Sequence, residues 1–343
     1  MKKLLLILLC LPFIGFGQQT YVPDDNFETY LEVNGMGDGI QLNDSVNFWA
    51  IEMLINLDVS NQNISDLTGI EDFTALTFLD CKDNQISSLD LSNNLYLEFL
   101  ACYKNQLTSL DVNGLTALWS LDCGENNLTS LDVSNNISLE QLSIYNNQFT
   151  SLDVSNNILL GLLACSDNQL TSIDISNNIN LSDLSLYGNN LISLDVSHNT
   201  ALDNLFCGGN NITELDLSKC PVLERLECAF NQLICLNLKA GNNVASIDQI
   251  NATNNPQLSC VEVDSIGFFS SNPFNSFNFD AGVSFSNSCN NNCSGTTSIQ
   301  EHIKNKELLK VTDLLGRETK GTKNKILFYI YDDGTVERKI IIE

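Results

Sequence analysis

Residues 121–136 read LDCGENNLTSLDVSNN, and this stretch recurs along the chain with little change. Aligned on its leucines, the sequence returns every 21 residues without gaps from residue 76 to residue 223. The first leucine column consists of Leu76, Leu97, Leu118, Leu139, Leu160, Leu181, Leu202 and Leu223. A second leucine column runs from Leu79 to Leu226, and an asparagine column runs from Asn84 to Asn231. A unit of this length cannot bury its own leucines, so the units are expected to stack into a solenoid.

The consensus of the unit, LxxLxCxxNxLxxLDVSNNxxL, resembles the leucine-rich repeat family across residues 54–260. The resemblance implies a solenoid with a parallel β-sheet on its concave face and a mostly irregular convex side. Strands stacked about 4.8 Å apart give about nine turns a length of ~43 Å. The asparagines are expected to serve the backbone where the chain leaves each strand, because an amide side chain both donates and accepts hydrogen bonds.

A column of cysteines lies two residues after the second leucine. Its members are Cys81, Cys102, Cys123, Cys165, Cys207 and Cys228. Ile144 and Leu186 take the same place in two units, so the position requires a compact apolar side chain. Thiols in a line do not surround a tetrahedral zinc ion, and parallel side chains hold their β-carbons wider apart than a disulfide prefers. We therefore predict that these cysteines are reduced core residues.

The first residues have the parts of a secretory signal peptide, which we predict for residues 1–17. Two lysines precede an apolar run from Leu4 to Phe16, and small glycines lie just before Gln18. A membrane anchor is the alternative, but the run is shorter than the roughly 18 to 20 residues of a spanning helix. The mature chain is therefore expected to be exported and to have no transmembrane segment.

Charge is distributed unevenly along the chain. Residues 18–298 carry five basic and 34 acidic side chains, whereas residues 299–343 carry nine basic and eight acidic ones. The acidic region at residues 18–298 is expected to repel phosphate backbones and anionic lipid, so nucleic acid and membrane surfaces are poor partners. Cations and basic proteins remain compatible with it.

Caps are expected at both ends of the solenoid, because its end turns would otherwise expose apolar surface. We assign residues 18–53 to an N-terminal cap whose helix starts at Pro23-Asp24-Asp25. Residues 261–289 form the predicted C-terminal cap, closed by a disulfide between Cys260 and Cys289. The pairing of Cys220, Cys235 and Cys293 is left open.

A polar linker at residues 290–298 precedes a segment of different composition at residues 299–343. Apolar alternation in LLKVTDLL, KILFYIY and TVERKIII predicts short strands there. The segment resembles the C-terminal sorting domain of proteins exported by the type IX (Por) system of Bacteroidetes, and the repeats resemble those of Bacteroidetes surface proteins and, more distantly, internalins. The residues that match the sorting motifs are Lys310, Asp313, Leu315, Gly316, Arg317, Glu318, Tyr329, Tyr331, Gly334 and Lys339. The resemblance implies export through the periplasm to the cell surface or medium, with the type IX machinery as a partner.

Solvent-facing strand positions are expected to line the concave face, where leucine-rich repeat proteins usually bind. The candidate binding residues are Phe78, Phe99, Tyr103, Trp119, Tyr145, Tyr187, Phe206 and Glu227. Aromatic anchors in an acidic field favour a protein partner with a basic surface. Glycan stacking is the alternative function, and packing of the rings on neighbouring turns is the purely structural interpretation.

A column of aspartates recurs on the convex side, including Asp111, Asp132 and Asp153. Carboxylates about 5 Å apart repel one another by roughly 1 to 3 kcal/mol, so something must offset that repulsion. The simplest offset is that each carboxylate accepts backbone N–H bonds in its own turn. Calcium bridging between turns is a second hypothesis, although one carboxylate in each turn falls short of six ligands. We predict no other cofactor.

Catalysis has little support in the sequence. The two histidines, His198 and His302, lie in a convex turn and in the tail, and no HExxH, GxSxG or phosphate-loop motif is present. The sequence therefore predicts a secreted or cell-surface binding or adhesion scaffold that is not an enzyme.

Overall fold

The computed structural model describes residues 18–241, 247–271 and 276–289, together with the backbone of three strands between residues 308 and 340. The chain divides into two compact units, residues 1–293 and residues 294–343. The predicted signal peptide and linker lie outside the described residues.

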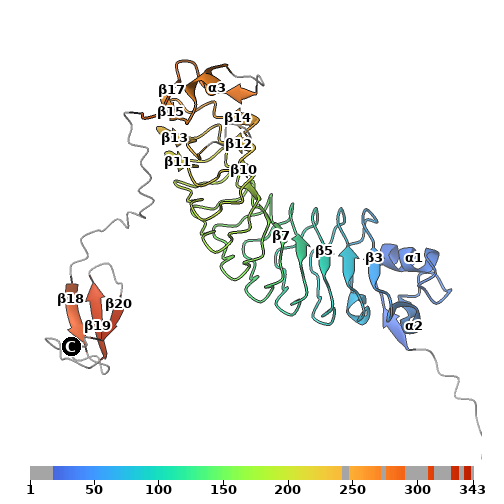
Figure 1. Ribbon diagram of the computed structural model, residues 1–343. Helices are drawn as coiled ribbons and strands as arrows, with labels where there is room; N and C mark the ends of the chain where they lie inside the picture. Colours follow the sequence, from blue (N-terminus) through green and yellow to red (C-terminus); the bar gives the residue numbers. More distant parts are fainter. Residues whose placement is uncertain are drawn as a thin grey trace, which may run out of the picture. The chain divides into compact units, whose positions relative to one another are not determined.

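One strand from each turn pairs with its neighbours in an 11-stranded parallel sheet, which follows the inner side of the coil in Figure 1. In spatial order its strands are β3 (Asn56–Asp58), β4 (Phe78–Asp80), β5 (Phe99–Ala101), β6 (Ser120–Asp122), β7 (Gln141–Ser143), β8 (Leu162–Ala164), β9 (Asp183–Ser185), β10 (Asn204–Phe206), β12 (Arg225–Glu227), β14 (Gln249–Asn251) and β16 (Phe277–Asn278). Pairing joins residues one turn apart, such as Leu100 with Leu121. The leucine-rich repeat solenoid predicted from the columns is confirmed, and its sheet extends beyond the regular repeats.

The core consists of the two leucine columns and the column that carries the cysteines. Leu79 is the middle residue of β4 and is fully buried, as are Leu76 and Cys81 on either side of the strand. The strand residues before and after the buried leucine face away from the core, because side chains alternate along a strand. Each turn thus supplies the same three apolar groups to one continuous core.

The asparagine column ties successive turns together as predicted. The amide nitrogen of Asn147 donates to the carbonyl oxygens of Cys123, Ile144 and Tyr145 at 3.0 to 3.2 Å. Its carbonyl oxygen accepts the Leu128 N–H at 2.9 Å. Cys123 and Leu128 belong to the preceding turn, so one side chain satisfies backbone groups of two turns.

A second asparagine column supports the convex side. It comprises Asn94, Asn136, Asn157, Asn178 and Asn199, all fully buried. Asn157, for example, donates to the carbonyls of Val133 and Asn136, one turn back, at 3.0 and 2.9 Å. Cys220 takes this position in a later turn, with its sulfur 3.9 Å from the carbonyl oxygens of Val196 and Asn199.

The convex side is not irregular throughout. From residue 214 onward its segments pair in a second parallel sheet. The strands are β11 (Glu214–Asp216), β13 (Cys235–Asn237), β15 (Cys260–Glu262) and β17 (Ser284–Ser286). β-Branched residues such as Ile234, Val261 and Val263 favour extended backbone there, whereas the earlier turns carry the turn-forming Thr-Ser and Ser-Asn-Asn.

An N-terminal cap covers the first turn. It contains β1 (Gln19–Tyr21), α1 (Asp25–Val33), β2 (Ser45–Asn47) and α2 (Phe48–Ile51), and a 3₁₀ turn at Ile70–Asp72 follows in the first repeat. One carboxylate oxygen of Asp24 caps α1 by accepting the N–H groups of Asn26 and Phe27 at 3.0 Å. The other oxygen accepts the N–H and hydroxyl of Ser65, which fastens the cap to the repeats.

The last turns form a cap rich in phenylalanine. α3 (Ile266–Ser271) places Phe269 against the rings of Phe277 and Phe285, with centroids 5.5 and 5.8 Å apart. Cys260 and Cys289, the predicted pair, form a disulfide in the structure. Cys235 is also disulfide-bonded, Cys220 is a buried free thiol, and Cys293 lies outside the described residues.

The second unit contains a three-stranded antiparallel sheet at the positions where alternation predicted strands. Its strands are β18 (Leu308–Thr312), β19 (Ile326–Tyr331) and β20 (Val336–Ile340). Four sorting-motif residues lie on these strands, namely Lys310, Tyr329, Tyr331 and Lys339. The other sorting-motif residues, Asp313, Leu315, Gly316, Arg317, Glu318 and Gly334, lie outside the described residues.

Candidate functional site

The candidate site is the outward surface of the 11-stranded sheet, which we call the concave face. Its side chains come from the first and last residues of each strand and from the residue two positions after the strand. The leucine in the middle of the repeat strands is nearly invariant, whereas the last strand position reads Asp80, Ala101, Asp122, Ser143, Ala164, Ser185, Phe206 and Glu227 in successive turns. The residue types on this face therefore change from turn to turn, whereas the core residues repeat.

Three aromatic residues cluster at the amino-terminal part of the concave face. The rings of Phe78 and Phe99 stack with centroids 4.5 Å apart and planes 7° apart. Trp119 lies 6.2 Å from Phe99 at a tilt of 54°. All three are half-buried, so the cluster (the aromatic stack) offers a rigid apolar surface of the kind that anchors protein partners.

The tyrosines that recur every second turn lie against small residues. A β-carbon built on Gly124 would lie 2.3 Å from a ring carbon of Tyr145, so this ring covers the glycine of the preceding turn. A β-carbon on Gly208 would lie 3.2 Å from a ring carbon of Tyr187. Tyr103 and Tyr145 are half-buried and Tyr187 is 41% exposed. Packing on neighbouring turns therefore accounts for part of this column, and Tyr187 extends furthest into solvent.

Lysine, carboxylate and tyrosine meet near the aromatic stack. The Lys82 ammonium lies 2.7 Å from an Asp80 carboxylate oxygen and 5.8 Å from the centre of the Tyr103 ring. The Lys104 ammonium lies 6.0 Å from the same ring and 3.5 Å from Asp83. A cation held by a carboxylate and a ring face is a stable combination. Lys82 is not among the predicted binding residues, because its relation to Asp80 and Tyr103 is not visible within a single unit of the repeat.

Asp122 is a half-buried carboxylate on the same face, one of whose oxygens accepts the Gly124 N–H at 3.0 Å. Burial, together with the nearby charges of Glu125 and Asp80, raises the pKa of Asp122 to about 6. Burial and the charges of Asp122 and Glu125 also raise the pKa of Tyr145. The two groups therefore lie in a partly desolvated region of negative potential, which favours an incoming cation.

The remaining predicted residues lie in later turns. Phe206 is half-buried at the end of β10. Glu227 accepts the Ala229 N–H at 3.1 Å with one oxygen and the Asn251 amide at 2.9 Å with the other. Glu227 is thus engaged within the sheet, and the predicted residues form two groups, of which the amino-terminal one is the larger.

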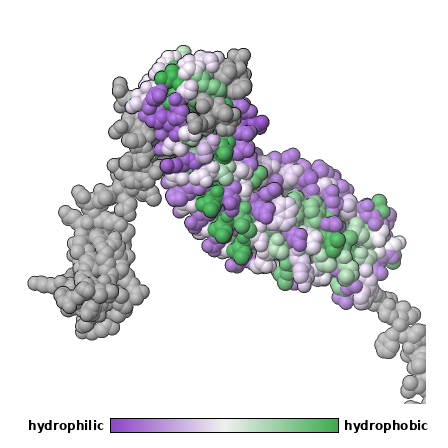
Figure 2. All heavy atoms as spheres, viewed as in Figure 1, coloured by the Kyte–Doolittle hydropathy of each residue, from purple (hydrophilic) through white to green (hydrophobic). Residues whose placement is uncertain are grey.

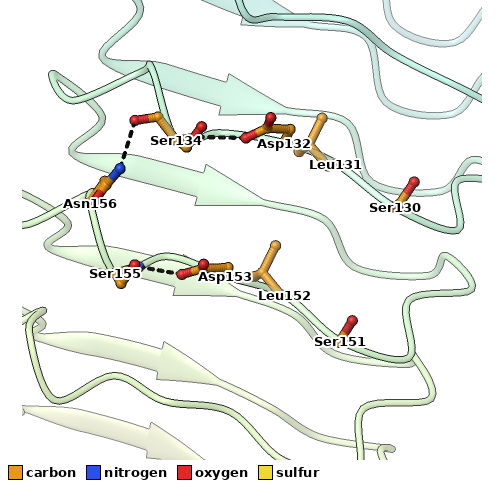
Figure 3. Close-up of a pocket in the computed structure, with 9 residues that line it drawn as sticks. All are labelled: Ser130, Leu131, Asp132, Ser134, Ser151, Leu152, Asp153, Ser155 and Asn156. Atoms are coloured by element: carbon orange, nitrogen blue, oxygen red, sulfur yellow. Dashed lines mark hydrogen bonds between the residues drawn. The ribbon is translucent and has the colours of Figure 1, made fainter. Parts of the chain in front are cut away.

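The carboxylates of the convex aspartates accept hydrogen bonds from backbone N–H groups of their own turns. Asp132 accepts the Ser134 N–H and Asp153 accepts the Ser155 N–H, both at 2.9 Å (Figure 3). Asp111 accepts the Asn113 N–H at 2.9 Å. Hydrogen bonds from the serines hold the pKa of Asp132 and of Asp153 below the usual value. This is the simpler of the two offsets that the sequence analysis considered.

A hollow of ≈ 260 Å³ separates these two convex turns, lined by Leu131, Leu152 and the serines and aspartates just described. Asn156 closes one end by donating to the Ser134 carbonyl at 3.1 Å (Figure 3). Among the described residues, one group of three carboxylates is close enough together to hold a metal ion, namely Asp25, Glu28 and Asp44 in the cap, where Glu28 accepts the N–H groups of Asn43 and Asp44. Calcium binding by Asp111, Asp132 and Asp153 stays a prediction, which calorimetry and melting with and without EDTA would test.

Exposed apolar side chains are not confined to the concave face. Figure 2 shows green, hydrophobic patches over the middle turns between purple, hydrophilic ones. Directly after the second asparagine column, Leu95, Ile137, Ile158 and Ile179 are each at least 51% exposed, and Tyr96 is 67% exposed. A test of the concave face therefore needs an equally exposed aromatic outside it, and Tyr96 is suitable.

The cysteine column is buried and its thiols are free in the structure. Burial raises the pKa of the Cys165 and Cys207 thiols, so they stay protonated and unreactive. The column is core, as predicted from its alternation with Ile144 and Leu186.

No family model matches the sequence. A stretch of 74 residues is 42% identical to Internalin J of Listeria monocytogenes serotype 4b (strain F2365), covering 22% of this chain and 8% of that protein. Among solved structures, the functional domain of InlJ from Listeria monocytogenes, described as including a cysteine ladder, is similar at 32% identity over 72% of this chain and 68% of that one, with a TM-score of 0.44. The leucine-rich repeat ectodomain of the Arabidopsis thaliana receptor kinase GASSHO1/SCHENGEN3, in complex with Casparian strip integrity factor 2, is 20% identical over 66% of this chain and 32% of that one, with a TM-score of 0.54.

The stacked units, their consensus and these similarities define the chain as a leucine-rich repeat protein. It is internalin-like, because a stretch of 74 residues is 42% identical to Internalin J. No helix among the described residues is long and apolar enough to cross a membrane.

Proposed function

We propose that this chain is an exported binding scaffold that recognises a protein partner through its concave face. The observation that carries the proposal is the aromatic stack of Phe78, Phe99 and Trp119 on a face whose residues vary while the core repeats. Rigid, partly exposed rings of this kind supply much of the binding energy in protein interfaces. The similar plant ectodomain was solved in complex with Casparian strip integrity factor 2, which supports the same use of the fold. The proposal includes no enzymatic activity and no cofactor.

Protein recognition is favoured over glycan recognition by the geometry of the rings. The faces of Phe78 and Phe99 cover one another at 4.5 Å, so those faces are not free to stack on sugars. Glycan binding would then depend on tyrosines such as Tyr187, which is 41% exposed. Glycan-array binding that is abolished by Tyr145→Ala would favour the glycan alternative.

Export by a type IX system is the second part of the proposal. The matches to the sorting motifs support it, and the strands β18, β19 and β20 carry four of those residues. We expect deletion of residues 299–343 to leave the protein in the periplasm. Unchanged secretion of the shortened chain would refute the sorting role and would leave the binding role untouched.

Paired variants test the binding role. Partners captured by the purified protein at the cell surface are identified by mass spectrometry, and capture is repeated with Phe99→Ala and with Tyr96→Ala. Loss of one partner with Phe99→Ala but not with Tyr96→Ala is the expected result, because both changes remove an aromatic ring in the same turn and only one lies on the concave face. Equal capture by both variants would contradict recognition by this face.

A further inference from the structure

We propose that Asp122, Glu125 and Tyr145 form a site on the concave face for a basic side chain, lysine or arginine, of the protein partner. This inference rests on the proposed protein-binding role of the face and names the chemistry of the contact.

The repeat provides an internal comparison for the site. Equivalent positions two turns apart can be compared. Asp122 is equivalent to Asp80, Gly124 to Lys82, and Tyr145 to Tyr103. Glu125 is likewise equivalent to Asp83, so both carboxylate positions are kept. Only the lysine is absent from the second set, and the residue at its position is the smallest available.

The first set shows what these positions bind. There the Lys82 ammonium lies 2.7 Å from Asp80 and 5.8 Å from the centre of the Tyr103 ring. The chain therefore fills this combination of carboxylate and ring with a cation of its own. At the second set the Tyr145 ring covers Gly124 and no lysine occupies this position, so an ammonium that contacts Asp122 and the ring has to come from another molecule.

No ion pair among the described residues involves the second set. Among the described residues, the ion pairs involve Lys82, Lys104 and Lys239, and none of them reaches Asp122. Asp122 accepts the Gly124 N–H, a neutral donor. The charge of Lys82 offsets that of Asp122 only in part, and a half-buried carboxylate beside Glu125 and Asp80 is stabilised further when a cation arrives. The raised pKa of Asp122 agrees with this geometry.

A lysine or arginine side chain fits the group better than a metal ion does. Calcium needs six or more oxygen ligands, and the metal-ligand geometry found among the described residues lies in the cap. An ammonium or guanidinium group needs a carboxylate and a ring face, which Asp122 and Tyr145 supply. The aromatic stack ends at Trp119, in the turn of Asp122, so apolar parts of the same partner have a surface nearby.

The test uses the purified full chain and trilysine amide as a probe, titrated by calorimetry at pH 7. Asp122→Asn keeps an acceptor for the Gly124 N–H and removes the charge. Gly124→Lys supplies a lysine in cis at the position that Lys82 has two turns earlier and displaces the Tyr145 ring that covers Gly124. We expect each to weaken trilysine binding on the order of tenfold. Asp132→Asn removes the same charge from the convex side and should change binding less than about twofold, because an exposed charge contributes little.

Several results would overturn the site. Equal weakening of trilysine binding by Asp122→Asn and Asp132→Asn would show that the probe responds only to the overall charge of the protein. Equal binding of trilysine and its uncharged Nε-acetylated form would show that the lysine charges do not contribute. If the Gly124→Lys protein folds and binds trilysine as the wild type does, Tyr145 and Asp122 do not contact the probe. If that protein does not fold, trilysine binding by Asp122→Asn is the deciding measurement. The natural partner separates the two proposals: capture lost with Phe99→Ala but kept with Gly124→Lys supports recognition by the concave face and refutes the basic-residue site.

Discussion

Asp122 and Asp132 lie ten residues apart in the same turn, and the structure treats them in opposite ways. Asp132 is exposed on the convex side, and its bonds to Ser134 lower its pKa. Asp122 is half-buried on the concave face, and burial beside Glu125 and Asp80 raises its pKa to about 6. The first carboxylate stabilises its own turn, whereas the second lies where its charge is costly.

The two carboxylates differ because one position carries the same residue in successive turns and the other does not. Asp132 has a counterpart with the same bond in neighbouring turns, at Asp90, Asp153, Asp174 and Asp195. Asp122 has alanine and serine, Ala101 and Ser143, as its neighbours in the column. The repeated aspartates and the amide nitrogens of both asparagine columns bond to the backbone, although the buried amide oxygens of the second column, such as that of Asn157, have no hydrogen-bond partner. A concave residue that varies has fewer such bonds and is available for a partner. Substitutions can test this rule.

The largest effect is expected for a repeated polar residue in the core. Asn147→Ala should lower the free energy of unfolding by roughly 3 to 5 kcal/mol, because several buried backbone groups lose their partner. Urea denaturation measures the loss. Asn127→Ala, at an exposed position, is the control and should change stability by less than about 0.5 kcal/mol. Similar losses in both would break the rule.

A variable residue should behave in the reverse manner. Asp122→Asn is expected to stabilise the protein by roughly 1 to 2 kcal/mol at pH 7, allowing for partial solvent screening. The folded-state pKa lies above the unfolded value, so the wild type loses stability as pH rises from about 4 through about 6. The gain should therefore vanish near pH 4. A variant less stable than wild type at pH 7 would contradict the assignment.

A repeated convex carboxylate should show a smaller and opposite change. Asp174→Ala removes the acceptor of the Ser176 N–H, and we expect a loss below about 1 kcal/mol because the site is exposed to water. Asp174→Asn should restore most of it. The folded pKa of Asp174 is lowered by its bonds to Ser176, so its contribution is present above the unfolded value and is lost as pH falls through the folded one. Melting temperatures between pH 2 and pH 7 measure both effects.

A small effect is also expected in the cysteine column, whose thiols repeat and fill space in the core. Cys165→Ile should change the free energy of unfolding by less than about 1.5 kcal/mol, since Ile144 fills the same place one turn earlier. Chemical denaturation measures it, with Leu163→Ala as a control that should cost about 2 to 5 kcal/mol. A loss for Cys165→Ile as large as that of the control would show that the thiol does more than fill space.

Period, strand position and core membership were all predictable from the columns, because each column repeats one physical requirement. The Asx bonds of the convex aspartates were predictable for the same reason, since Asp and Ser two residues apart form them locally. The second convex sheet was not expected, because it begins at Glu214, where the leucine and asparagine columns still repeat unchanged and give no sign of a different backbone on the convex side. Lys82 and Asp122 belong to the surface predicted to be concave, but they were not selected as binding residues, because their relation appears only when units two turns apart are compared.

The sequence alone determined that this chain coils into a solenoid, which residues fill its core, and which asparagines serve its backbone. These follow from periodicity, since identical units in identical surroundings must adopt the same conformation. Only the tertiary structure decided that Tyr145 covers Gly124, that Lys82 pairs with Asp80 beside the Tyr103 ring, and that none of the ion pairs among the described residues includes Asp122. These contacts join side chains of different turns, and their geometry depends on which residue each neighbouring turn places beside them.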